Sequence, residues 1–232
     1  MDARRRRRSV AMAAVAFLLA APSALPDDGW TTLFDGRSTK DWRGYNRPSF
    51  PAGCWSVTDG TLKTVPSKTP DACDLVTRRK YRDFELALEW KVGKGGNSGI
   101  LYRAAELPSP APIWHSAPEL QILDDAAHPA AKPQTLTGSL YDLVAPVDKV
   151  LRPVGEWNEA RVVVRGDHVE HWLNGRKVLE YELGSDALRA RIAASKFKDM
   201  PRFAQEKKGH VGLQHHGEEA WFRNIRIRTL RP

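Results

Sequence analysis

Short stretches in which apolar and polar residues alternate run through most of this chain, and Gly, Pro, Asn and Asp separate them. In the clearest stretch, residues 84–92, every even-numbered residue is apolar and three of the four odd-numbered residues are charged. A period of two is that of a β-strand with one face in a core. The same pattern predicts further strands over residues 99–104, 119–123, 160–165, 169–173, 209–214 and 221–229.

Two turn signals connect neighbouring strands. Gly166 lies between two of them, and Asn174-Gly175 is typical of a type I′ hairpin turn. Strands at this spacing with turns between them predict an antiparallel sandwich. A single helix is expected over residues 187–194, capped by Ser185 or Asp186. We therefore expect an all-β fold with a short helical insertion.

The N-terminus has the pattern of an export signal. A basic run over residues 4–8 precedes an apolar run over residues 10–21, and small residues follow. The apolar run is too short to span a bilayer. We expect a signal over residues 1–24, one domain over residues 25–232, and a periplasmic or secreted protein. The alternative is an uncleaved anchor. The arginines permit a twin-arginine route without specifying it, and no cysteine follows to carry a lipid.

Composition narrows the choice of partner. The net charge is +8, but removing the five N-terminal arginines with their one acid leaves +4, scattered among acids. This disfavours nucleic acid as a partner. The 8 Trp either pack the core or stack on sugar rings. Cys54 and Cys73 flank apparent strands, so in an exported protein they can pair, or they stay as two thiols. The oligomeric state is left open.

A series of short phrases in a fixed order carries a family resemblance. They are GWTTLFDG (29–36), NSGILYR (97–103), PELQILDD (118–125), TGSLYD (137–142), GEWN (155–158), EHWLNG (170–175), SKF (195–197), GLQHHG (212–217) and FRNI (222–225). Together they resemble the 3-keto-disaccharide hydrolase family over about residues 29–230. The resemblance implies a concanavalin/laminin-G-like jelly roll with one concave face. It also implies cleavage of glycosides whose sugar carries a ketone at C3.

A C3 ketone makes the C2 proton acidic, which opens an unusual route to glycoside cleavage. A base removes that proton, the enolate expels the C1 substituent, and water then adds to the unsaturated ketone. The route needs a base near C2, positive charge near the ketone oxygen and an acid for the leaving group. It does not need the carboxylate pair of ordinary glycosidases, although direct hydrolysis by such a pair is an alternative.

Four residues are candidates for the catalytic roles. Glu119 is the first choice as base, because Leu120 and Ile122 face a core and leave Glu119 and Gln121 on the other face. Glu89, on the non-core face of its own strand, is a candidate second carboxylate or a surface acid.

His171 can serve as acid or base near neutrality, yet it shares a face with Val169 and Leu173, which favours a packed histidine. The family phrase suggests Lys196 for the enolate charge, and an exposed lysine is the alternative.

Further residues are expected to bind the sugar. They are Arg103, Gln121, Asp124, Tyr141, Trp114, Trp172, Gln214 and His215. Asn97-Ser98-Gly99 is expected as a turn at the cleft edge. His215 and His216 are adjacent, so at most one of them points into a cleft. His215, His171, Glu119 and Asp124 could ligate a divalent cation only if the fold brings them together. No other cofactor is implied.

Two rival functions stay open beside the keto-sugar enzyme. A non-catalytic carbohydrate-binding module predicts stacking Trp on the concave face without acids. A glycosidase acting on unoxidised glycans through Glu89 and Glu119 predicts two carboxyl groups at roughly 5–10 Å. The keto-sugar enzyme predicts one base with a lysine, an arginine or a cation beside it.

Overall fold

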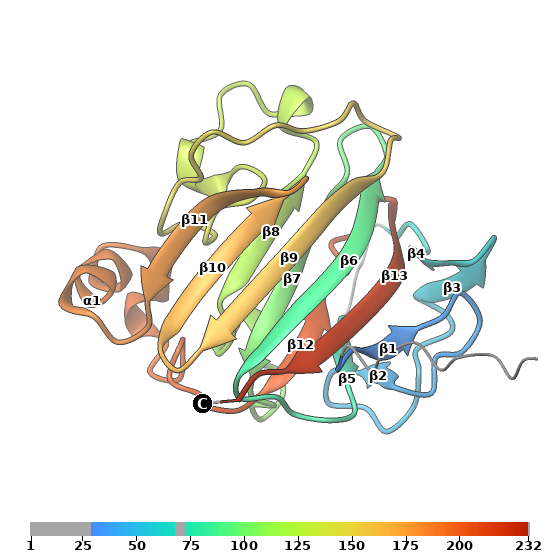
Figure 1. The fold of residues 1–232 in the computed structure, drawn as a ribbon, viewed down its shortest axis with the longest axis horizontal. Coiled ribbons are helices and arrows are strands. Elements are labelled where there is room, and N and C mark those ends of the chain that lie inside the picture. The colour runs from blue at the N-terminus through green and yellow to red at the C-terminus, as the bar shows by residue number, and fades with distance from the viewer. Residues whose placement is uncertain (1–28, 68–72, 232) are drawn as a thin grey trace, which may run out of the picture.

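Two antiparallel β-sheets packed face to face form the body of the molecule in a computed structural model, which describes residues 29–67 and 73–231. The expected export signal over residues 1–24 lies outside these residues. Figure 1 shows the eight-stranded sheet in front of the five-stranded sheet, with the helix beside the β11 edge. The all-β sandwich predicted from the sequence is confirmed. No helix in the described ranges is long and apolar enough to cross a membrane.

The eight-stranded sheet has the order β11-β10-β9-β6-β13-β4-β3, and β1 pairs with β13. Its strands are β1 (Thr31–Phe34), β3 (Trp55–Thr58), β4 (Thr61–Thr64), β6 (Phe84–Val92), β9 (Asn158–Arg165), β10 (His168–Leu173), β11 (Arg176–Glu182) and β13 (Ala220–Thr229). The five-stranded sheet has the order β2-β5-β12-β7-β8. Its strands are β2 (Trp42–Gly44), β5 (Leu75–Thr77), β7 (Asn97–Ala104), β8 (Glu119–Leu123) and β12 (His210–Leu213).

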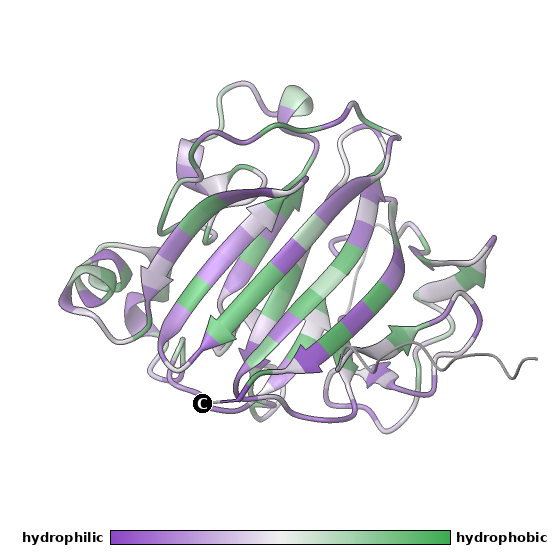
Figure 2. Ribbon diagram, viewed as in Figure 1, coloured by the Kyte–Doolittle hydropathy of each residue, from purple (hydrophilic) through white to green (hydrophobic). Residues whose placement is uncertain are grey.

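The core lies between the sheets and follows the period of two. Strand β6 has the predicted bounds, and its Leu86 is buried opposite Val162 of β9 and Ile227 of β13. Ile100 and Leu120 enter the same core from the five-stranded sheet. Figure 2 shows the resulting alternation of hydrophobic and hydrophilic residues along the front strands. Burial of the apolar face is thus what fixes the orientation of each strand.

The predicted turns and helix are also present. Asn174 and Gly175 both have positive φ, 46° and 80°, as a type I′ turn between β10 and β11 requires. Helix α1 (Asp186–Ala193) is capped by Ser185, whose side chain accepts a hydrogen bond from the Leu188 backbone N–H. Short 3₁₀ turns complete the loops: η1 (Ile113–His115), η2 (Asp125–Ala127), η3 (Pro133–Thr135) and η4 (Lys196–Asp199).

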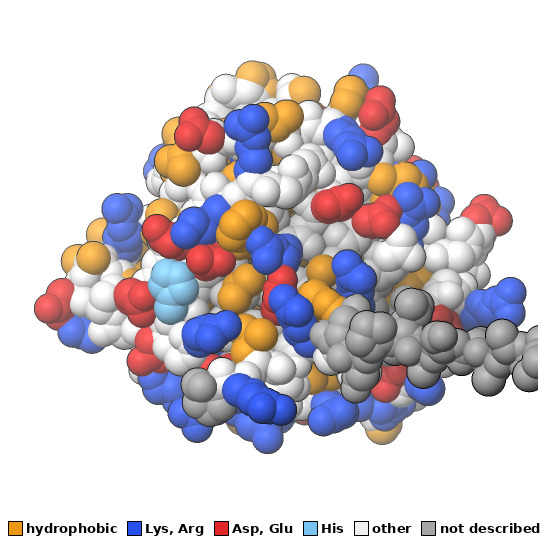
Figure 3. All heavy atoms as spheres, viewed as in Figure 1, with side chains coloured by type: hydrophobic (Ala, Val, Ile, Leu, Met, Phe, Trp, Pro, Cys, Tyr) orange, Lys and Arg blue, Asp and Glu red, His pale blue; other side chains and the backbone are white. Residues whose placement is uncertain are grey.

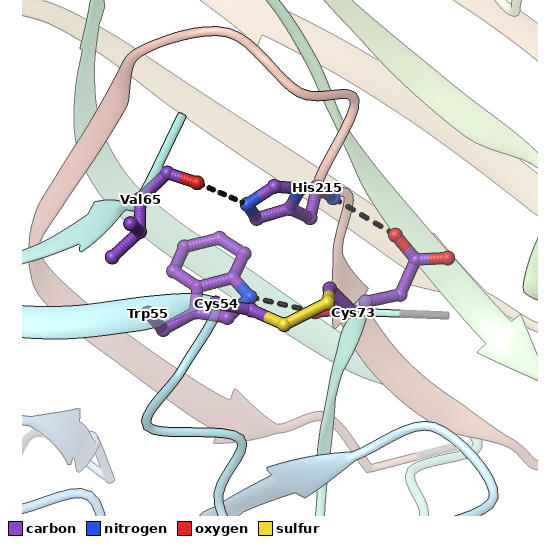
Figure 4. Close-up of a disulfide and its surroundings, with 6 residues drawn as sticks. Cys54, Trp55, Val65, Cys73 and His215 are labelled. Atoms are coloured by element: carbon purple, nitrogen blue, oxygen red, sulfur yellow. Dashed lines mark hydrogen bonds between the residues drawn. A yellow bond between two sulfur atoms is a disulfide. The ribbon is translucent and has the colours of Figure 1, made fainter. Parts of the chain in front are cut away.

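A disulfide joins Cys54 to Cys73, which settles the choice that the sequence left open between a bond and two thiols. Cys54 precedes β3 of the eight-stranded sheet, and Cys73 shortly precedes β5 of the five-stranded sheet. The bond therefore ties the two layers together at one edge. Figure 4 shows it beside Trp55, whose indole N–H donates to the Cys73 carbonyl.

Candidate active site

A polar hollow of about 180 Å³ lies on the outer face of the five-stranded sheet. It is lined by Asn97, Trp114, Glu119, Gln121, Tyr141, Lys196, Gln214 and His216. Leu120 and Ile122 of β8 point into the core, so Glu119 and Gln121 face outward, as the alternation predicted. Residues of β7 and the end of β12 form the rest of the floor, and loops carry the walls.

Gly99 makes room for the Glu119 carboxyl. Gly99 lies inside β7, paired with Gln121 of β8, and not in the turn that the sequence suggested. A Cβ added at Gly99 would lie 1.9 Å from the Glu119 Oε1 atom. The carboxyl of Glu119 therefore reaches from β8 over β7 and occupies the side-chain position that Gly99 leaves free. Any larger residue at position 99 would have to displace it.

Glu119 is a buried acid whose Oε1 has no hydrogen-bond partner among the described residues. Burial, helped by the charge of Asp74 and opposed by the nearby Lys196 ammonium, raises the pKa of its carboxyl to about 8. An acid with its pKa near neutrality can exchange a proton with a bound molecule. The unpartnered oxygen is the atom that such a molecule would meet.

Lys196 is held among aromatic rings. Its Nζ lies 4.5 Å from the ring centroid of Trp114 and 4.4 Å from that of Tyr141. These are cation–π distances. Burial lowers the pKa of Lys196, while the charges of Glu119 and Asp142 counteract the shift. The hollow thus sets an acid with a raised pKa beside an amine with a lowered one, an arrangement suited to proton transfer.

Amides and one imidazole complete the polar lining. The Gln121 side chain donates to Asn97 Oδ1 at 3.1 Å, and Gln214 lines the hollow beside them. His216 lines the rim and lies 2.9 Å from Glu218, between His Nδ1 and the carboxylate. Of the two adjacent histidines, His216 reaches the hollow, and the face that it shares with Gln214 was the sequence signal for this.

His215 lies beside the hollow and not in it. Its Nε2 lies 3.0 Å from the Val65 carbonyl oxygen, and its ring meets Trp55 edge-on, as Figure 4 shows. Its backbone N–H donates to the Asp74 carboxylate. His215 therefore connects the segments around the disulfide and is not placed to bind a sugar in the hollow.

His171 lies in the core between the sheets, away from the hollow. Its Nε2 is 2.8 Å from the Tyr102 hydroxyl, and its Nδ1 is 3.1 Å from the Gly138 carbonyl oxygen. Burial lowers the pKa of this imidazole to about 4. The face that His171 shares with Val169 and Leu173 is the core face. His171 is therefore a packed core histidine and not a residue of the site.

Glu89 and Trp172 lie on the outer face of the eight-stranded sheet, on the other side of the sandwich from Glu119. Glu89 pairs with Arg223. The Arg161 guanidinium stacks 3.8 Å from the Trp172 ring centroid. Figure 3 views this face, where cationic and anionic side chains are interspersed. Glu89 cannot be the second carboxylate beside Glu119, because the two sheets separate them.

Arg103 and Asp124 are used to hold backbone segments. The buried Arg103 guanidinium donates to the carbonyl oxygens of Arg82 and Gly166. The Asp124 carboxylate accepts from the Gly95 backbone N–H at 2.8 Å, and as the N-cap of η2 it also accepts from the Ala127 backbone N–H. Both side chains are turned toward backbone groups, and neither lines the hollow.

The four candidate metal ligands do not converge. Within the described part of the chain, the group of three ligating side chains that come close together is His168, Glu170 and Glu180, on the eight-stranded sheet. Lys177 lies there with its Nζ 2.6 Å from Glu180 and 3.4 Å from Glu170, so an ammonium already neutralises the acids. Of the residues that line the hollow, Glu119 and His216 are the two of a metal-ligating type.

The sandwich with a polar hollow on one sheet places the chain in a known class of folds. A Bacillus subtilis protein of unknown function with a galectin-like fold superposes with a TM-score of 0.52 at 15% identity, over 86% of this chain and 98% of that one. This likeness shows the fold alone. Residues 29–228 match the model of the 3-keto-alpha-glucoside-1,2-lyase-like domain, and the chain belongs to that family.

Two kinds of relative agree with this membership. A 3-keto-disaccharide hydrolase of Bacteroides thetaiotaomicron is 39% identical over 230 residues, which cover 88% of this chain and 79% of the relative. A crystal structure of a candidate glycosyl hydrolase from Parabacteroides distasonis superposes with a TM-score of 0.81 at 31% identity, over 88% of this chain and 94% of that one. A second structure from that organism, described in the same way, superposes with a TM-score of 0.68 at 30% identity, over 87% of this chain and 99% of that one.

Proposed function

We propose that this protein cleaves the glycosidic bond of 3-keto-glycosides, with Glu119 as the base that removes the C2 proton. The observation that carries the proposal is the buried, unpartnered Glu119 carboxyl held over Gly99 within reach of the Lys196 charge. The 3-keto-disaccharide hydrolase of Bacteroides thetaiotaomicron supports it as a relative. The 3-keto-glycoside is then the substrate partner.

Each neighbour of Glu119 has a task in this reaction. The Lys196 ammonium would stabilise the negative charge that develops on the ketone oxygen as the C2 proton leaves. Trp114 and Tyr141 hold that ammonium and offer aromatic surface to a sugar ring. Gln121, Asn97 and Gln214 present amides to the ring hydroxyls. The small volume of the hollow suits the keto sugar ring and leaves the leaving group outside it.

The base must be ionised before it can act. With the pKa of Glu119 raised to about 8 by burial, the carboxyl is largely protonated at neutral pH in the empty hollow. For a leaving group that departs without protonation, kcat/KM should therefore rise with pH through about 8. After the leaving group departs, the protonated Glu119 can return its proton to C2 as water adds to C1. The sum of the two steps is hydrolysis.

Release of a chromogenic leaving group from a 3-keto-glucoside and from the matching unoxidised glucoside tests the proposal. We expect wild type to cleave the keto form alone, and Glu119→Gln to lose at least ~100-fold of that activity. Glu89→Gln is the matched control, since it removes an acid from the other sheet, and it should keep the activity. A chelator-treated sample tests whether a divalent cation is needed.

Two outcomes of this assay would contradict the proposal. Cleavage of the unoxidised glucoside with equal efficiency would favour an ordinary glycosidase. Binding of the keto sugar without cleavage of either substrate would favour a carbohydrate-binding module.

We also propose that residues 1–24 direct export of this chain to the periplasm or medium. The basic and apolar runs of that segment support the proposal, and so does the Cys54–Cys73 disulfide, because such bonds persist in oxidising compartments. Fractionation with mass measurement of the mature N-terminus tests it. Recovery from the cytoplasm with an intact N-terminus would contradict it.

A further inference from the structure

A second carboxyl group, that of Asp74, lies on the same face of the five-stranded sheet as Glu119. Strand β5 pairs with β12 in the register Leu75 to Leu213 and Val76 to Gly212. One step further, this register sets Asp74 beside Gln214. The Gln214 backbone N–H donates to the Gly99 carbonyl, and Gly99 pairs with Gln121. Asp74 therefore begins a row that crosses four strands and passes through the floor of the hollow.

The row has a gap in its middle, and Glu119 fills that gap. Gly99 carries no side chain, and the Glu119 carboxyl lies where its Cβ would be. Neighbouring strands are about 4.8 Å apart, so two steps from β5 to β7 amount to roughly 10 Å. Only the Gln214 side chain separates Asp74 from Glu119 along this row. Paired carboxyls of glycosidases lie within a similar range of roughly 5–10 Å.

Hydrogen bonds fix the position of Asp74 but leave one of its carboxylate oxygens able to contact a substrate. Its Oδ1 accepts the His215 backbone N–H at 2.8 Å, and its carbonyl accepts the Tyr45 backbone N–H. Asp74 directly follows Cys73, which the disulfide fixes to Cys54. The residue stays half-buried, and among the described residues Oδ2 has no hydrogen bond. Figure 4 shows the His215 side of this arrangement.

The burial of the Asp74 carboxyl, and not the charge near it, suits a proton donor. Burial raises the pKa of its carboxyl to about 6, while the His215 N–H and the charge of His216 oppose the shift. Asp74 lies close enough to Glu119 for its charge to act on the Glu119 carboxyl, and the charge of Lys196 acts on that carboxyl as well. A carboxyl with a pKa near 6 carries the proton of a general acid in most molecules below that pH, so cleavage that needs this acid should weaken as the pH rises past 6.

We propose that Asp74 is the general acid that protonates the departing glycosidic oxygen, a role that rests on the proposed cleavage of 3-keto-glycosides. The keto ring sits over Glu119, walled by Trp114, Tyr141 and Lys196. The leaving group extends from the hollow across Gln214 toward β5, and there it meets Asp74.

The protons and electrons balance over the two steps. Glu119 takes the C2 proton, and the electron pair of that bond forms the enolate. The enolate collapses to a C1–C2 double bond, the ketone reforms, and the C1–O pair leaves on the glycosidic oxygen, which takes the proton of Asp74. Water then adds to C1 and gives a proton to the Asp74 carboxylate, while Glu119 returns its proton to C2. Both acids end as they began.

Leaving groups that differ in basicity test this role. A 4-nitrophenolate departs without protonation, whereas a methoxide needs an acid. We expect Asp74→Asn to reduce kcat/KM for the methyl 3-keto-glucoside about 100-fold or more, with the 4-nitrophenyl 3-keto-glucoside little changed. The asparagine keeps an oxygen to accept the His215 N–H, so the thermal midpoint should stay near that of wild type. Asp59→Asn, in the β3–β4 turn, is the matched control and should leave both substrates unaffected.

The outcomes separate this inference from the proposed function. An equal fall for both substrates in Asp74→Asn would overturn the acid role, because a displaced strand affects every leaving group alike. An unchanged rate on the methyl substrate would overturn it too. If wild type cleaves neither keto substrate, the proposed function itself fails. Cleavage of the unoxidised methyl glucoside that needs both Asp74 and Glu119 would instead indicate a two-carboxylate glycosidase.

Discussion

At the scale of the residue, the site depends on a side chain that is absent. Glu119 can turn its carboxyl over β7 only because Gly99 has no Cβ. The two residues are twenty positions apart and meet through the pairing of β7 with β8. The surrounding protein then removes water from the carboxyl and raises its pKa to about 8. The close approach of Glu119 to β7 therefore sets both the position of its carboxyl and its raised pKa.

Replacing Gly99 by alanine should impair turnover without unfolding the protein. The new Cβ would collide with Glu119 Oε1, which is the mobile end of a side chain, so the carboxyl moves and the strand stays. We expect kcat on a 3-keto-glucoside to fall about 100-fold, since a displacement of this size disrupts alignment. Gly53→Ala is the control, because a Cβ there meets nothing within 4 Å. If Gly99→Ala lowers the rate further in a Glu119→Gln background, the two residues do not act together.

Glu119 should also make the stability of the protein fall with rising pH. Its folded pKa of about 8 lies above the ordinary value of 4.5, so between these values the folded state holds a proton that the unfolded state has lost. The favourable contribution is complete below about pH 4.5 and is lost as the pH rises through 8. Between pH 5 and 9, we expect the free energy of unfolding of wild type to fall by on the order of 4 kcal/mol relative to that of Glu119→Gln. Urea unfolding of both proteins at both pH values measures this difference. An equal change with pH in wild type and Glu119→Gln would count against a buried acid.

At the scale of the element, the parity of a strand decides which chemistry its residues can serve. On β10 the side chains of Val169, His171 and Leu173 enter the core, whereas Trp172 faces solvent under Arg161. On β8 the same rule places Leu120 inside and Glu119 outside. A histidine or a tryptophan in a family phrase therefore has no fixed role until its strand has been assigned to a sheet and a face.

His171→Phe should lower stability and spare activity. The change removes the contacts of the imidazole with the Tyr102 hydroxyl and the Gly138 carbonyl. The Tyr102 hydroxyl keeps its contact with the Tyr181 hydroxyl, whereas the Gly138 carbonyl loses its side-chain partner. We expect the free energy of unfolding to drop by about 1–3 kcal/mol, with kcat/KM per folded molecule on a 3-keto-glucoside unchanged. Denaturant titration and the chromogenic assay provide the two readouts. A loss of turnover in fully folded His171→Phe would return His171 to the list of catalytic candidates.

At the scale of the whole molecule, the disulfide holds together the edge of the sandwich that carries Asp74. Cys54 belongs to the segment before β3 and Cys73 to the segment before β5, so the bond crosses between the two sheets. Trp55 and His215 pack against the same corner. The hollow lies on the outer face of the sheet that this bond anchors, and its position depends on the docking of both layers.

Removing the disulfide should destabilise the fold. The bond closes a loop between residues 19 positions apart, and a loop of this length contributes about 3 kcal/mol by restricting the unfolded chain. We expect Cys54→Ser/Cys73→Ser to lose a similar free energy in urea titrations. Wild type with the bond reduced should match the double variant, and wild type in oxidising buffer is the control. An unchanged midpoint would show that the bond adds no stability.

The sequence by itself determined the strands with a clear period of two, the hairpin at Asn174-Gly175, the capped helix and the outward direction of Glu119 and Gln121. These features depend on neighbours in the chain, so local patterns reveal them. The family phrases added Lys196, Tyr141 and Gln214, and Trp114 was expected as a stacking platform; all four line the hollow.

Only the tertiary structure decided which faces meet. It separated Glu89 from Glu119 by assigning their strands to different sheets, and it used Arg103, Asp124 and His215 to hold backbone segments. It also set Asp74 in one row with Gly99, although 25 positions separate them in the chain. Strand order and register are long-range properties that arise from burying apolar faces together, and no local pattern contains them.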